Sequence, residues 1–346
     1  MDSDFTQDSP FPDAIDRRIA QALQVRPRAS FSELGDVLGL AEQTVARRYR
    51  RLRREGLLRV TMVYEPTAAN STSWQIRVHC RPEGAASIAE ALSRRQDVSW
   101  VVIQNAGSEV SFGLRATDDA HADELLGRLL PKAAPVLDVS AYQVLHVFAG
   151  GSTGDFWKGW IDEPLTPTQV CALRDADDLP VPDGSPARPL TAADRRLVAE
   201  LARDGRTSFA SLARSTGMSV GRVTRRFEAL LRSGAVYLDV DIAPALSGTG
   251  TAATFWMTVR PDRLTAVGEA LAAHPAVPFS AAITGSANLV ATIITPNQGG
   301  IYAFLTRTLG PIDGITGYEL VPHWRRVKYA SALTVGDRLA PPAPLP

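Results

Sequence analysis

Cysteine is scarce in this chain of 346 residues: only Cys80 and Cys171 are present. Two cysteines in a chain of this size predict neither a disulfide framework nor a zinc site, so a reducing, cytoplasmic location is expected. The five histidines are scattered without the spacing of metal ligands. The sequence also lacks a P-loop, a Gly-x-Gly-x-x-Gly run and a Ser-His-Asp order. We therefore expect no metal and no cofactor.

Long apolar runs and a net charge are missing as well. No run approaches the roughly 18 apolar residues of a membrane span, and the acidic, proline-containing first residues are unlike a signal peptide. The 37 basic and 37 acidic residues cancel, but unevenly along the chain. Residues 13–64 hold eleven arginines against six acidic residues, and residues 191–242 hold nine against six. Two local basic modules indicate two surfaces that bind polyanions.

The same pattern occurs twice, once in each half of the chain. Residues 16–64 align without a gap with residues 194–242. The identical positions include Asp16/Asp194, Leu34/Leu212, Gly39/Gly217, Val45/Val223, Arg47/Arg225, Arg48/Arg226, Leu52/Leu230 and Gly56/Gly234. The distance between the copies is too large for a solenoid repeat, so it indicates a duplicated domain unit.

Each copy predicts three helices followed by an extended segment. In the first copy Asp13 caps a helix that Pro27 ends, and Ser30 with Glu33 forms the capping box of a second helix. Gly39 provides a tight turn before a third helix over about 42–55. Gly56 stops that helix, and residues 57–64 are rich in apolar and β-branched side chains. The second copy repeats these signals at Thr191, Ser208, Gly217, Ser219 and Gly234.

The segments after the two modules are also related, and both predict the order β-α-β-β-α-β. In the first half we expect strands at 73–80, 98–105, 110–116 and 139–147, with helices at 83–95 and 120–130. In the second half we expect strands at 254–259, 277–284, 289–295 and 315–320, with helices at 262–274 and 299–309. This is the ferredoxin-like arrangement, which leaves one sheet face bare. The two bare faces are predicted to pack together, making the chain a covalent pseudo-dimer that can assemble further.

The fold class is therefore α+β, with two winged helix-turn-helix domains and two ferredoxin-like domains in tandem. The domains are expected at 12–65, 72–149, 190–243 and 251–333. Residues 150–189 form a proline-rich linker with a short helix near 168–174, and Phe156, Trp157 and Trp160 are too apolar to stay in water. The proline-rich tail, 341–346, is expected to be disordered.

The arginine-rich third helix of each module predicts a DNA-reading helix, because a helix fits the major groove and arginines hold phosphates. The alternative is a solvated basic helix in a plain three-helix bundle. Pairs Arg48–Asp16 and Arg226–Asp194 are predicted to be internal, since Arg48 and Arg226 border the buried stripe. The candidate DNA-binding residues are Gln43, Thr44, Arg47, Arg50, Arg51, Arg54, Ser219, Arg222, Thr224 and Arg225, with Val220 and Gly221 also facing out at the helix start.

The runs LGLAEQTVARRYRRLRREG and TGMSVGRVTRRFEALLRSG resemble the leucine-responsive/asparagine regulator (Lrp/AsnC) family, whose pattern is Val-x-x-Arg-aromatic/aliphatic-x-x-Leu-x-x-x-Gly. Ala41 replaces the usual serine cap in the first copy. The resemblance implies a sequence-specific regulator of transcription that binds double-stranded DNA. It also implies that the sheet domains dimerise and bind a small effector, commonly an amino acid.

Members of the family usually carry a Gly-x-x-Asp turn that lines the effector site. Here the corresponding turns are Gly107-Ser-Glu-Val110 and Gly285-Ser-Ala-Asn288, so the aspartate is absent twice. We expect an effector near Gly285, Ser286 and Asn288, and a lapsed site around Gly107 because Val110 is apolar. The alternative is that both turns are simple hairpins and that the sheet domains only dimerise.

The sirohaem decarboxylases resemble this family and use the same two-half layout, with a His-Asn-Tyr-x-Arg-like run after the first sheet helix. The matching stretches here, DVSWVVIQNAG (97–107) and AVPFSAAITG (276–285), contain no histidine, tyrosine or arginine. An enzyme is therefore not predicted.

Overall fold

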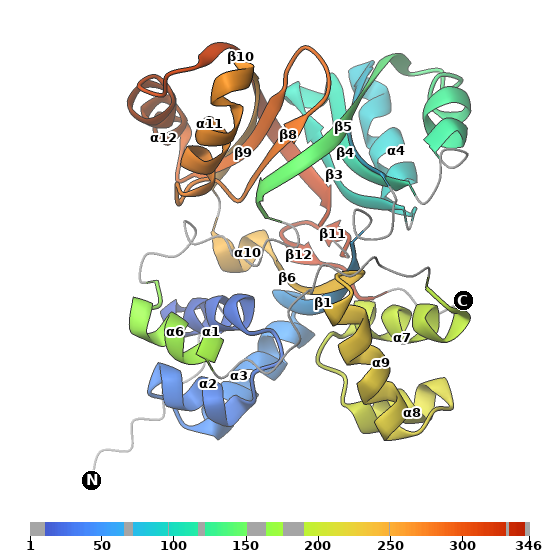
Figure 1. Ribbon diagram of the computed structural model, residues 1–346, viewed down its shortest axis with the longest axis vertical. Coiled ribbons are helices and arrows are strands. Elements are labelled where there is room, and N and C mark those ends of the chain that lie inside the picture. Colours follow the sequence, from blue (N-terminus) through green and yellow to red (C-terminus); the bar gives the residue numbers. More distant parts are fainter. Residues whose placement is uncertain are drawn as a thin grey trace.

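The computed structural model describes residues 11–65, 72–95, 97–116, 122–150, 164–175, 190–248, 250–329 and 332–342. It confirms an α+β fold built as a tandem duplication. Figure 1 shows a β-barrel with helices on its outside in one layer and two helical modules in the other. The linker aromatics Phe156, Trp157 and Trp160 and most of the proline-rich tail lie outside the described residues.

The two helical modules have the same element order. The first consists of α1 (Ala14–Val25), α2 (Phe31–Leu38), α3 (Glu42–Arg54) and β1 (Leu58–Tyr64). The second consists of α7 (Ala192–Arg203), α8 (Phe209–Thr216), α9 (Val220–Arg232) and β6 (Val236–Ile242). Gly39 and Gly217 are left-handed and end the second helix of each module, which explains why the sequence has glycine there.

Most of the predicted helix caps are confirmed. The side chains of Asp13, Ser30 and Thr191 each accept a hydrogen bond within a capping box, and Ser208 accepts one from the Ser211 amide. The prediction for Ser219 is wrong, because its side chain makes no capping bond at the start of α9. Ala41 makes none at the start of α3 either, so the third helices of the two modules begin alike.

The extended segments of the two modules pair with each other instead of forming separate hairpin wings. Strands β1 and β6 are antiparallel, with Thr61 opposite Asp239 at the centre of the register. These two positions are equivalent in the alignment of the copies, so the pseudo-twofold axis of the repeat passes through this pair. Met62 of β1 is part of the second module's core, and Val240 of β6 is part of the first module's core.

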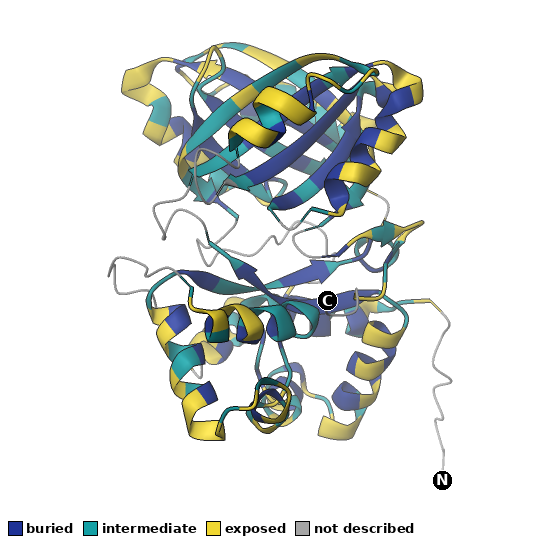
Figure 2. Cartoon of the chain, turned by 90° about the vertical axis from the view of Figure 1, so that its right-hand side faces the viewer, coloured by how far each residue is buried: buried dark blue, intermediate teal, exposed yellow. Residues whose placement is uncertain are grey.

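The barrel contains four strands from each half. The first half supplies β2 (Thr72–Cys80), α4 (Pro82–Ser93), β3 (Val98–Gln104), β4 (Glu109–Ala116), a π-helical turn (Asp123–Leu129) and β5 (Val136–Ala149). The second half supplies β7 (Thr251–Val259), α11 (Leu264–Ala272), β8 (Phe279–Ile283), β9 (Leu289–Thr295), α12 (Gln298–Ala303) with a π-helical turn (Phe304–Leu309), and β10 (Ile315–Lys328). The strand order around the closed barrel is β10-β3-β4-β2-β5-β8-β9-β7. Figure 2 shows strands that are buried along much of their length and, outside them, helices whose outer residues are exposed.

The last strand of each half closes the barrel by pairing with the other half. Strand β5 pairs first with β2 and then with β8, whereas β10 pairs first with β7 and then with β3. Each strand changes partner next to a bulge, at Leu145 and at Trp324, and both bulge residues are exposed. The predicted strand 315–320 is therefore too short. Pro322, the bulge at Trp324, and Arg325 and Arg326 interrupt the alternation of apolar and polar residues that marks a strand. The sequence pattern therefore does not indicate that the strand continues past Leu320.

An ionic cluster joins the two halves of the barrel, and in it Arg77 and Glu109 are buried whereas Glu319 is exposed. The Arg77 guanidinium donates two hydrogen bonds to Glu109 (both 2.8 Å) and two to Glu319 of the other half (2.7 and 2.8 Å). It also lies 4.9 Å from the ring centroid of Trp256. Because both carboxylates bond the guanidinium, the pKa of Arg77 is raised despite its burial.

A chain of hydrogen bonds continues from this cluster across the barrel. The Ser111 hydroxyl lies 3.1 Å from Glu109 and 2.5 Å from Gln104, and the Gln104 amide donates to Thr254 of the other half at 3.2 Å. Thr254 then lies 2.8 Å from Nε2 of His323. Burial lowers the pKa of His323 to about 3, so its imidazole is neutral near pH 7.

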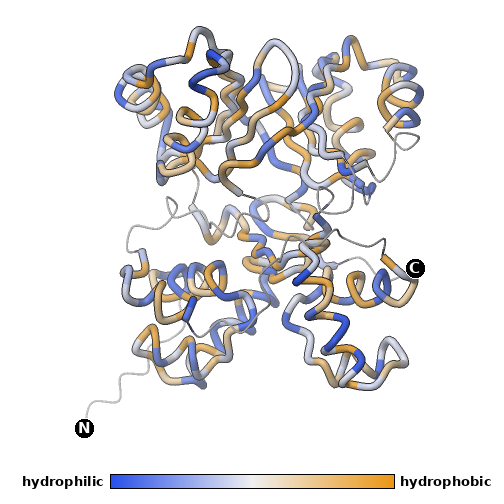
Figure 3. The backbone as a smooth tube through the Cα atoms, viewed as in Figure 1, coloured by the Kyte–Doolittle hydropathy of each residue, from blue (hydrophilic) through white to orange (hydrophobic). Residues whose placement is uncertain are grey.

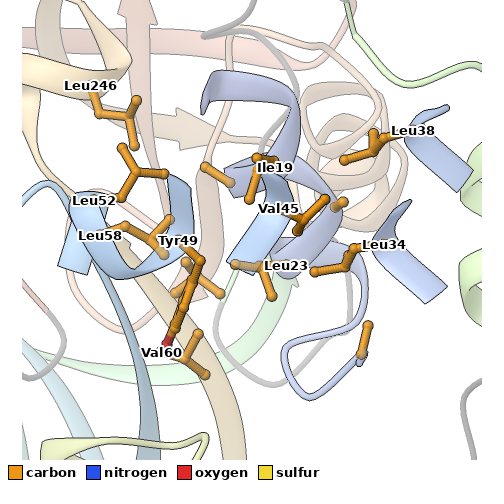
Figure 4. Close-up of a cluster of buried hydrophobic side chains, with 14 of the residues drawn as sticks. Ile19, Leu23, Leu34, Leu38, Val45, Tyr49, Leu52, Leu58, Val60 and Leu246 are labelled. Carbon is orange, nitrogen blue, oxygen red and sulfur yellow. The ribbon is translucent and has the colours of Figure 1, made fainter. Parts of the chain in front are cut away.

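Three connecting elements dock on the first helical module. Helix α6 (Pro167–Asp175) is the predicted linker helix, and its Leu173 is buried in that module's core. Helix α10 (Pro244–Ser247) contributes Leu246, which lies beside Leu52 and Leu58 in the same core (Figure 4). The C-terminal hairpin β11 (Thr334–Val335) and β12 (Arg338–Leu339) is bonded to the end of α3 through Gly56, which accepts from the Leu339 amide at 2.7 Å. Gly56 has φ +66°, and a Cβ there would collide with the Leu339 carbonyl oxygen. Among the described helices, none is long and apolar enough to cross a bilayer.

Replacing Arg77 by methionine should destabilise the barrel strongly, because it leaves the fully buried Glu109 carboxylate without its arginine partner. We expect a loss of about 3–5 kcal/mol in the free energy of unfolding. Glu319→Gln should cost less than about 1 kcal/mol, because the Glu319 side chain is 54% exposed. Scanning calorimetry checks both, and Glu109→Gln in the Arg77→Met background should recover part of the loss. Equal melting temperatures for Arg77→Met and Glu319→Gln would contradict this role.

Candidate nucleic-acid interface

The third helix of the first module, α3, is the first candidate recognition helix, and it presents one stripe of exposed polar side chains. Gln43, Arg47, Arg50 and Arg54 are exposed and follow the helical spacing of 4, 3 and 4 residues. Thr44 is half-buried beside them. Val45, Tyr49 and Leu52 lie in the core, as predicted (Figure 4). The helix therefore separates a buried apolar face from a basic outer face.

The second candidate recognition helix, α9, has a related but different outer face. Ser219, Arg222 and Arg225 are exposed at its start, and Arg232 is exposed at its end. Thr224 is half-buried, and its hydroxyl donates to the Val220 carbonyl of its own helix at 3.1 Å. Figure 3 shows hydrophilic segments along the helices of both modules. The positions that correspond to Thr44 and Arg50 are Arg222 and Glu228, so the two faces differ in chemistry.

Two arginines of α3 are turned away from this face toward Asp16. Nη1 of Arg48 lies 3.0 Å from the fully buried Asp16 carboxylate and 2.8 Å from Asp13. Arg51 also pairs with Asp16 and is buried. The predicted Arg48–Asp16 pair is thus present. Arg51, predicted as a DNA-binding residue, instead belongs to this internal cluster, because its position on the helix faces α1.

The second module has the corresponding pair in a more exposed form. Arg226 pairs with Asp194, as predicted, and the arginine side chain is 26% exposed. Although burial alone would raise it, hydrogen bonds from Thr191 and Arg226 hold the pKa of Asp194 below its usual value. The residue that corresponds to Arg51 is Ala229, so Asp194 has one arginine where Asp16 has two.

Sequence reasoning missed three arginines that connect the modules. Arg53, on α3, forms a 2.9 Å ion pair with Asp204 of the second module. Arg28 and Arg206 each reach into the opposite module. The one available signal was that Arg28 and Arg206 are identical in the aligned copies, each preceding a helix cap. Nothing local in the sequence indicates that their partners lie in the other half of the chain.

The predicted effector turn of the second half lies where β8 meets β5 of the first half. The Thr284 amide donates to the Gln143 carbonyl at 2.9 Å, and a Cβ on Gly285 would lie 2.7 Å from the Tyr142 ring. Asn288 bonds the Val259 backbone with both ends of its amide, at 2.7 and 2.8 Å. The amide that was predicted to hold a ligand is therefore already engaged in the structure.

The turn of the first half has a different register from the one expected. Val78 pairs with Val110, and the corresponding Met257 pairs with Leu289, so Glu109 occupies the place of Asn288. Val110 instead points into the helix-side core. The interpretation of Val110 as the lost site residue is wrong, because the Gly107 turn is one residue shorter than its counterpart. A carboxylate is present, but it is bonded to Arg77.

A separate hollow of about 280 Å³ lies at the outer end of the second half. Its lining includes His274, Thr295, Phe304, Arg307 and Thr308. His274 already accepts a bond from the Ala276 amide and lies 3.4 Å from the Thr308 hydroxyl. Across the residues the structure describes, no group of three or more His, Cys, Asp or Glu side chains could hold a metal ion.

Comparison with known proteins identifies the domains. The AsnC-type helix-turn-helix domain matches residues 13–53 and 190–231, and the Lrp/AsnC ligand binding domain matches residues 252–333. The chain belongs to the Lrp/AsnC family. An uncharacterized HTH-type transcriptional regulator of Pyrococcus furiosus is 28% identical over 127 residues, which span 36% of this chain and 86% of that protein.

The architecture of this Lrp/AsnC-family chain is also found in a solved enzyme structure. The siroheme decarboxylase NirDL aligns over 91% of this chain and 93% of its own, with a TM-score of 0.60 and 17% identity. Its complex with an iron-uroporphyrin III analogue gives the same score and identity. At this identity the likeness shows a shared duplicated fold, with both helix-turn-helix modules and both sheet domains in one chain.

Replacing Asp16 by asparagine should loosen the first module more than Asp194→Asn loosens the second. Asp16 is fully buried between two arginines, so its replacement removes the carboxylate that both buried cations share and should cost about 3–5 kcal/mol. Asp194 has one partly exposed arginine partner, and we expect a cost of about 1 kcal/mol. Hydrogen exchange of the α1 and α7 amides measures the two modules separately. Equal changes in protection would rule out the proposed difference.

Proposed function

We propose that this chain is a sequence-specific DNA-binding regulator of transcription. The observation that carries the proposal is the pair of exposed arginine stripes on α3 and α9, held by one chain on helix-turn-helix modules. A recognition helix of this kind fits the major groove, where arginine reads guanine and neighbouring arginines hold phosphates. Buried Asp16 and Asp194 fix the helices behind these stripes, so the exposed side chains start from rigid positions.

The recognition helices α3 and α9 are proposed to prefer different DNA half-sites. Gln43, Thr44 and Arg50 on α3 correspond to Gly221, Arg222 and Glu228 on α9. Glu228 accepts hydrogen bonds and repels phosphate, whereas Arg50 donates and attracts it. A homodimer would present two identical faces and favour a palindrome. Two different faces in one chain favour an operator without internal symmetry.

The alternative function is that of an enzyme like the siroheme decarboxylases. The full-length likeness to NirDL supports this alternative, but at 17% identity it extends only to the fold. The decarboxylase-like His-Asn-Tyr-x-Arg run has no counterpart in β3 or β8, where the described side chains are mainly apolar. We therefore propose that the chain is not a decarboxylase.

We further propose that a small metabolite with a carboxylate, such as an amino acid, binds near Gly285, Ser286 and Asn288. The match of residues 252–333 to a ligand binding domain supports this proposal. The turn lies beside β5 of the other half, so a ligand there would contact the junction between the halves. Backbone amides at a glycine turn can hold a carboxylate, which does not require the Asn288 amide.

Replacing Arg47 or Arg225 by alanine should each weaken operator binding by about tenfold or more, since one good arginine contact is worth about 1–3 kcal/mol. If the lost contact is to phosphate, the slope of log affinity against log salt should fall by about one. Fluorescence anisotropy at several salt concentrations measures both quantities.

Arg94→Ala is the matched control for these variants. It removes the same charge at the C-terminal end of α4, on the outside of the barrel, where the Arg94 side chain is 71% exposed and pairs with Glu90. Its affinity should equal that of the parent. If Arg47→Ala and Arg225→Ala also bind like the parent at matched salt, the assignment of these helix faces is wrong.

A ligand panel should separate the regulator from the enzyme. We expect at least one amino acid to raise the melting temperature of the chain, because ligand binding to the folded state stabilises it. An iron-uroporphyrin should produce no shift in melting temperature or in its own absorbance spectrum, and sirohaem should not lose carbon dioxide. Decarboxylation by the purified chain would establish the enzyme instead. A panel with no amino-acid response would favour sheet domains that only hold the halves together.

A further inference from the structure

Arg28 of the first helical module is inserted into the second module. Its guanidinium donates hydrogen bonds to the backbone carbonyls of Gly205 and Thr207, the latter at 3.1 Å. The same group lies over two aromatic rings, 4.9 Å from the centroid of Phe209 and 5.1 Å from that of Phe227. Phe227 belongs to the recognition helix α9 and Phe209 begins α8. One side chain of the first module therefore contacts the second module's recognition helix.

Arg206 of the second module makes the reciprocal insertion. It donates to the Pro27 carbonyl at 2.8 Å, and it lies 5.0 Å from the Phe31 ring and 5.2 Å from the Tyr49 ring. Tyr49 belongs to the recognition helix α3. Arg28 and Arg206 occupy equivalent positions of the aligned copies, as do Phe31 and Phe209, and Tyr49 and Phe227. The two insertions are thus the same contact made in both directions.

Each of these arginines is anchored in the opposite module by its hydrogen bonds to carbonyls and by its contacts with aromatic rings. Burial and, secondarily, the nearby charge of Arg206 lower the pKa of Arg28, and burial lowers the pKa of Arg206 as well. Each guanidinium combines charge-assisted bonds to carbonyls with stacking on aromatic faces. A lysine could provide the charge but not the planar stacking.

Other contacts between the modules are only partly reciprocal, because the position equivalent to Gly205 is Pro27 and the one equivalent to Arg53 is Leu231. The ribbon of β1 and β6 joins them, and Met62 and Val240 each enter the opposite core. Gly205 donates to the Val60 carbonyl at 2.8 Å, and a Cβ on Gly205 would lie 2.9 Å from the Val60 side chain. The modules are packed against each other as one body, and three contacts between them involve α3 or α9: Arg28 with Phe227, Arg206 with Tyr49, and Arg53 with Asp204.

We propose that Arg28 and Arg206 form a reciprocal arginine clasp that fixes the separation and mutual orientation of α3 and α9. The clasp makes the chain accept duplex DNA only when two half-sites stand at one spacing and in one order. This inference rests on the proposed DNA-binding function. Arg28 and Arg206 are positioning residues in it, since their guanidinium groups are engaged with the opposite module and not directed at DNA.

The first test measures the clasp without DNA. Spin labels are placed at Gln43→Cys and Gly221→Cys, which are equivalent exposed positions at the starts of α3 and α9. Cys171 is exposed and is replaced by serine, whereas Cys80 is buried, and burial raises the pKa of its thiol. Double electron–electron resonance should give one narrow distance distribution in the parent.

The clasp variants are Arg28→Ala/Arg206→Ala and the milder Arg28→Lys/Arg206→Lys, which keeps the charge. Both should broaden the distance distribution, the alanine variant more, while the circular dichroism spectrum stays unchanged. If the alanine variant does not fold, the lysine variant decides the question. A distribution as narrow as the parent's in a folded clasp variant overturns the proposal, whatever happens on DNA.

The second test varies the DNA. Half-sites recovered with the parent are joined by spacers that are shortened or lengthened by about one to four base pairs, and by one full helical turn of about ten. The parent should prefer one spacing by about tenfold or more, and the clasp variants by less than about threefold, with unchanged affinity for a single half-site. A parent that binds all spacings equally overturns the proposal. A parent that binds no duplex counts against the proposed function, while the label distances still decide whether the clasp exists.

Discussion

The pairing of each half's last strand with the other half is the constraint on which the rest of the structure depends. Because β5 continues onto β8 and β10 continues onto β3, the two sheets have no free edges and close as one barrel. In each half, the last strand of the helical module, β1 or β6, is followed along the chain by the first barrel strand of that half, β2 or β7. The ribbon of β1 and β6, which lies below the barrel in Figure 1, holds the modules at a common centre.

Duplication within one chain has allowed the two halves to become different where a homodimer would have to be alike. Arg77 faces Trp256, which occupies the corresponding place in the second half. In a symmetric dimer of first halves, two buried arginines would face each other, which is electrostatically unfavourable. Glu109 and Asn288 differ in the same way: one forms an ion pair and the other bonds backbone. The barrel interior thus favours pairing of unlike halves.

The same divergence extends to the outer faces of α3 and α9, whereas the contacts of Arg28 and Arg206 between the modules have stayed symmetric. Arg50 and Glu228 differ at equivalent positions on the outer faces of the two helices, yet Arg28 and Arg206 keep matching partners. Helix α6 and the C-terminal hairpin add contacts to the first module through Leu173 and Gly56. The first module is therefore tied to the linker and to the end of the second half.

Sequence reasoning succeeded where a signal is local or repeated. Caps such as Ser30 and turns such as Gly39 act within a few residues, and comparing the two copies identified the Arg48–Asp16 pair. It failed where the deciding partner is remote in sequence. The prediction of Arg51 as a DNA contact is wrong, because Arg51 pairs with Asp16, and the burial of Asp16 is decided by the packing of α1 on α3.

Two further failures have the same kind of cause. The second half of β10 was missed because bulges and Pro322 break the alternation that marks a strand. The role of Glu109 was missed because one turn is a residue shorter than the other, and strand pairing alone fixes that register. The arginine clasp needed knowledge of how two copies of the repeat face each other, which a linear comparison does not provide.

The most direct measurement of the central claim is an unbiased selection of random duplex DNA by the purified full-length chain, followed by sequencing. An account with two unlike readers held in one rigid body predicts an enriched site made of two different motifs, in one order and at one spacing. Enrichment of a palindrome, of one motif at variable spacing, or of no sequence at all would contradict it.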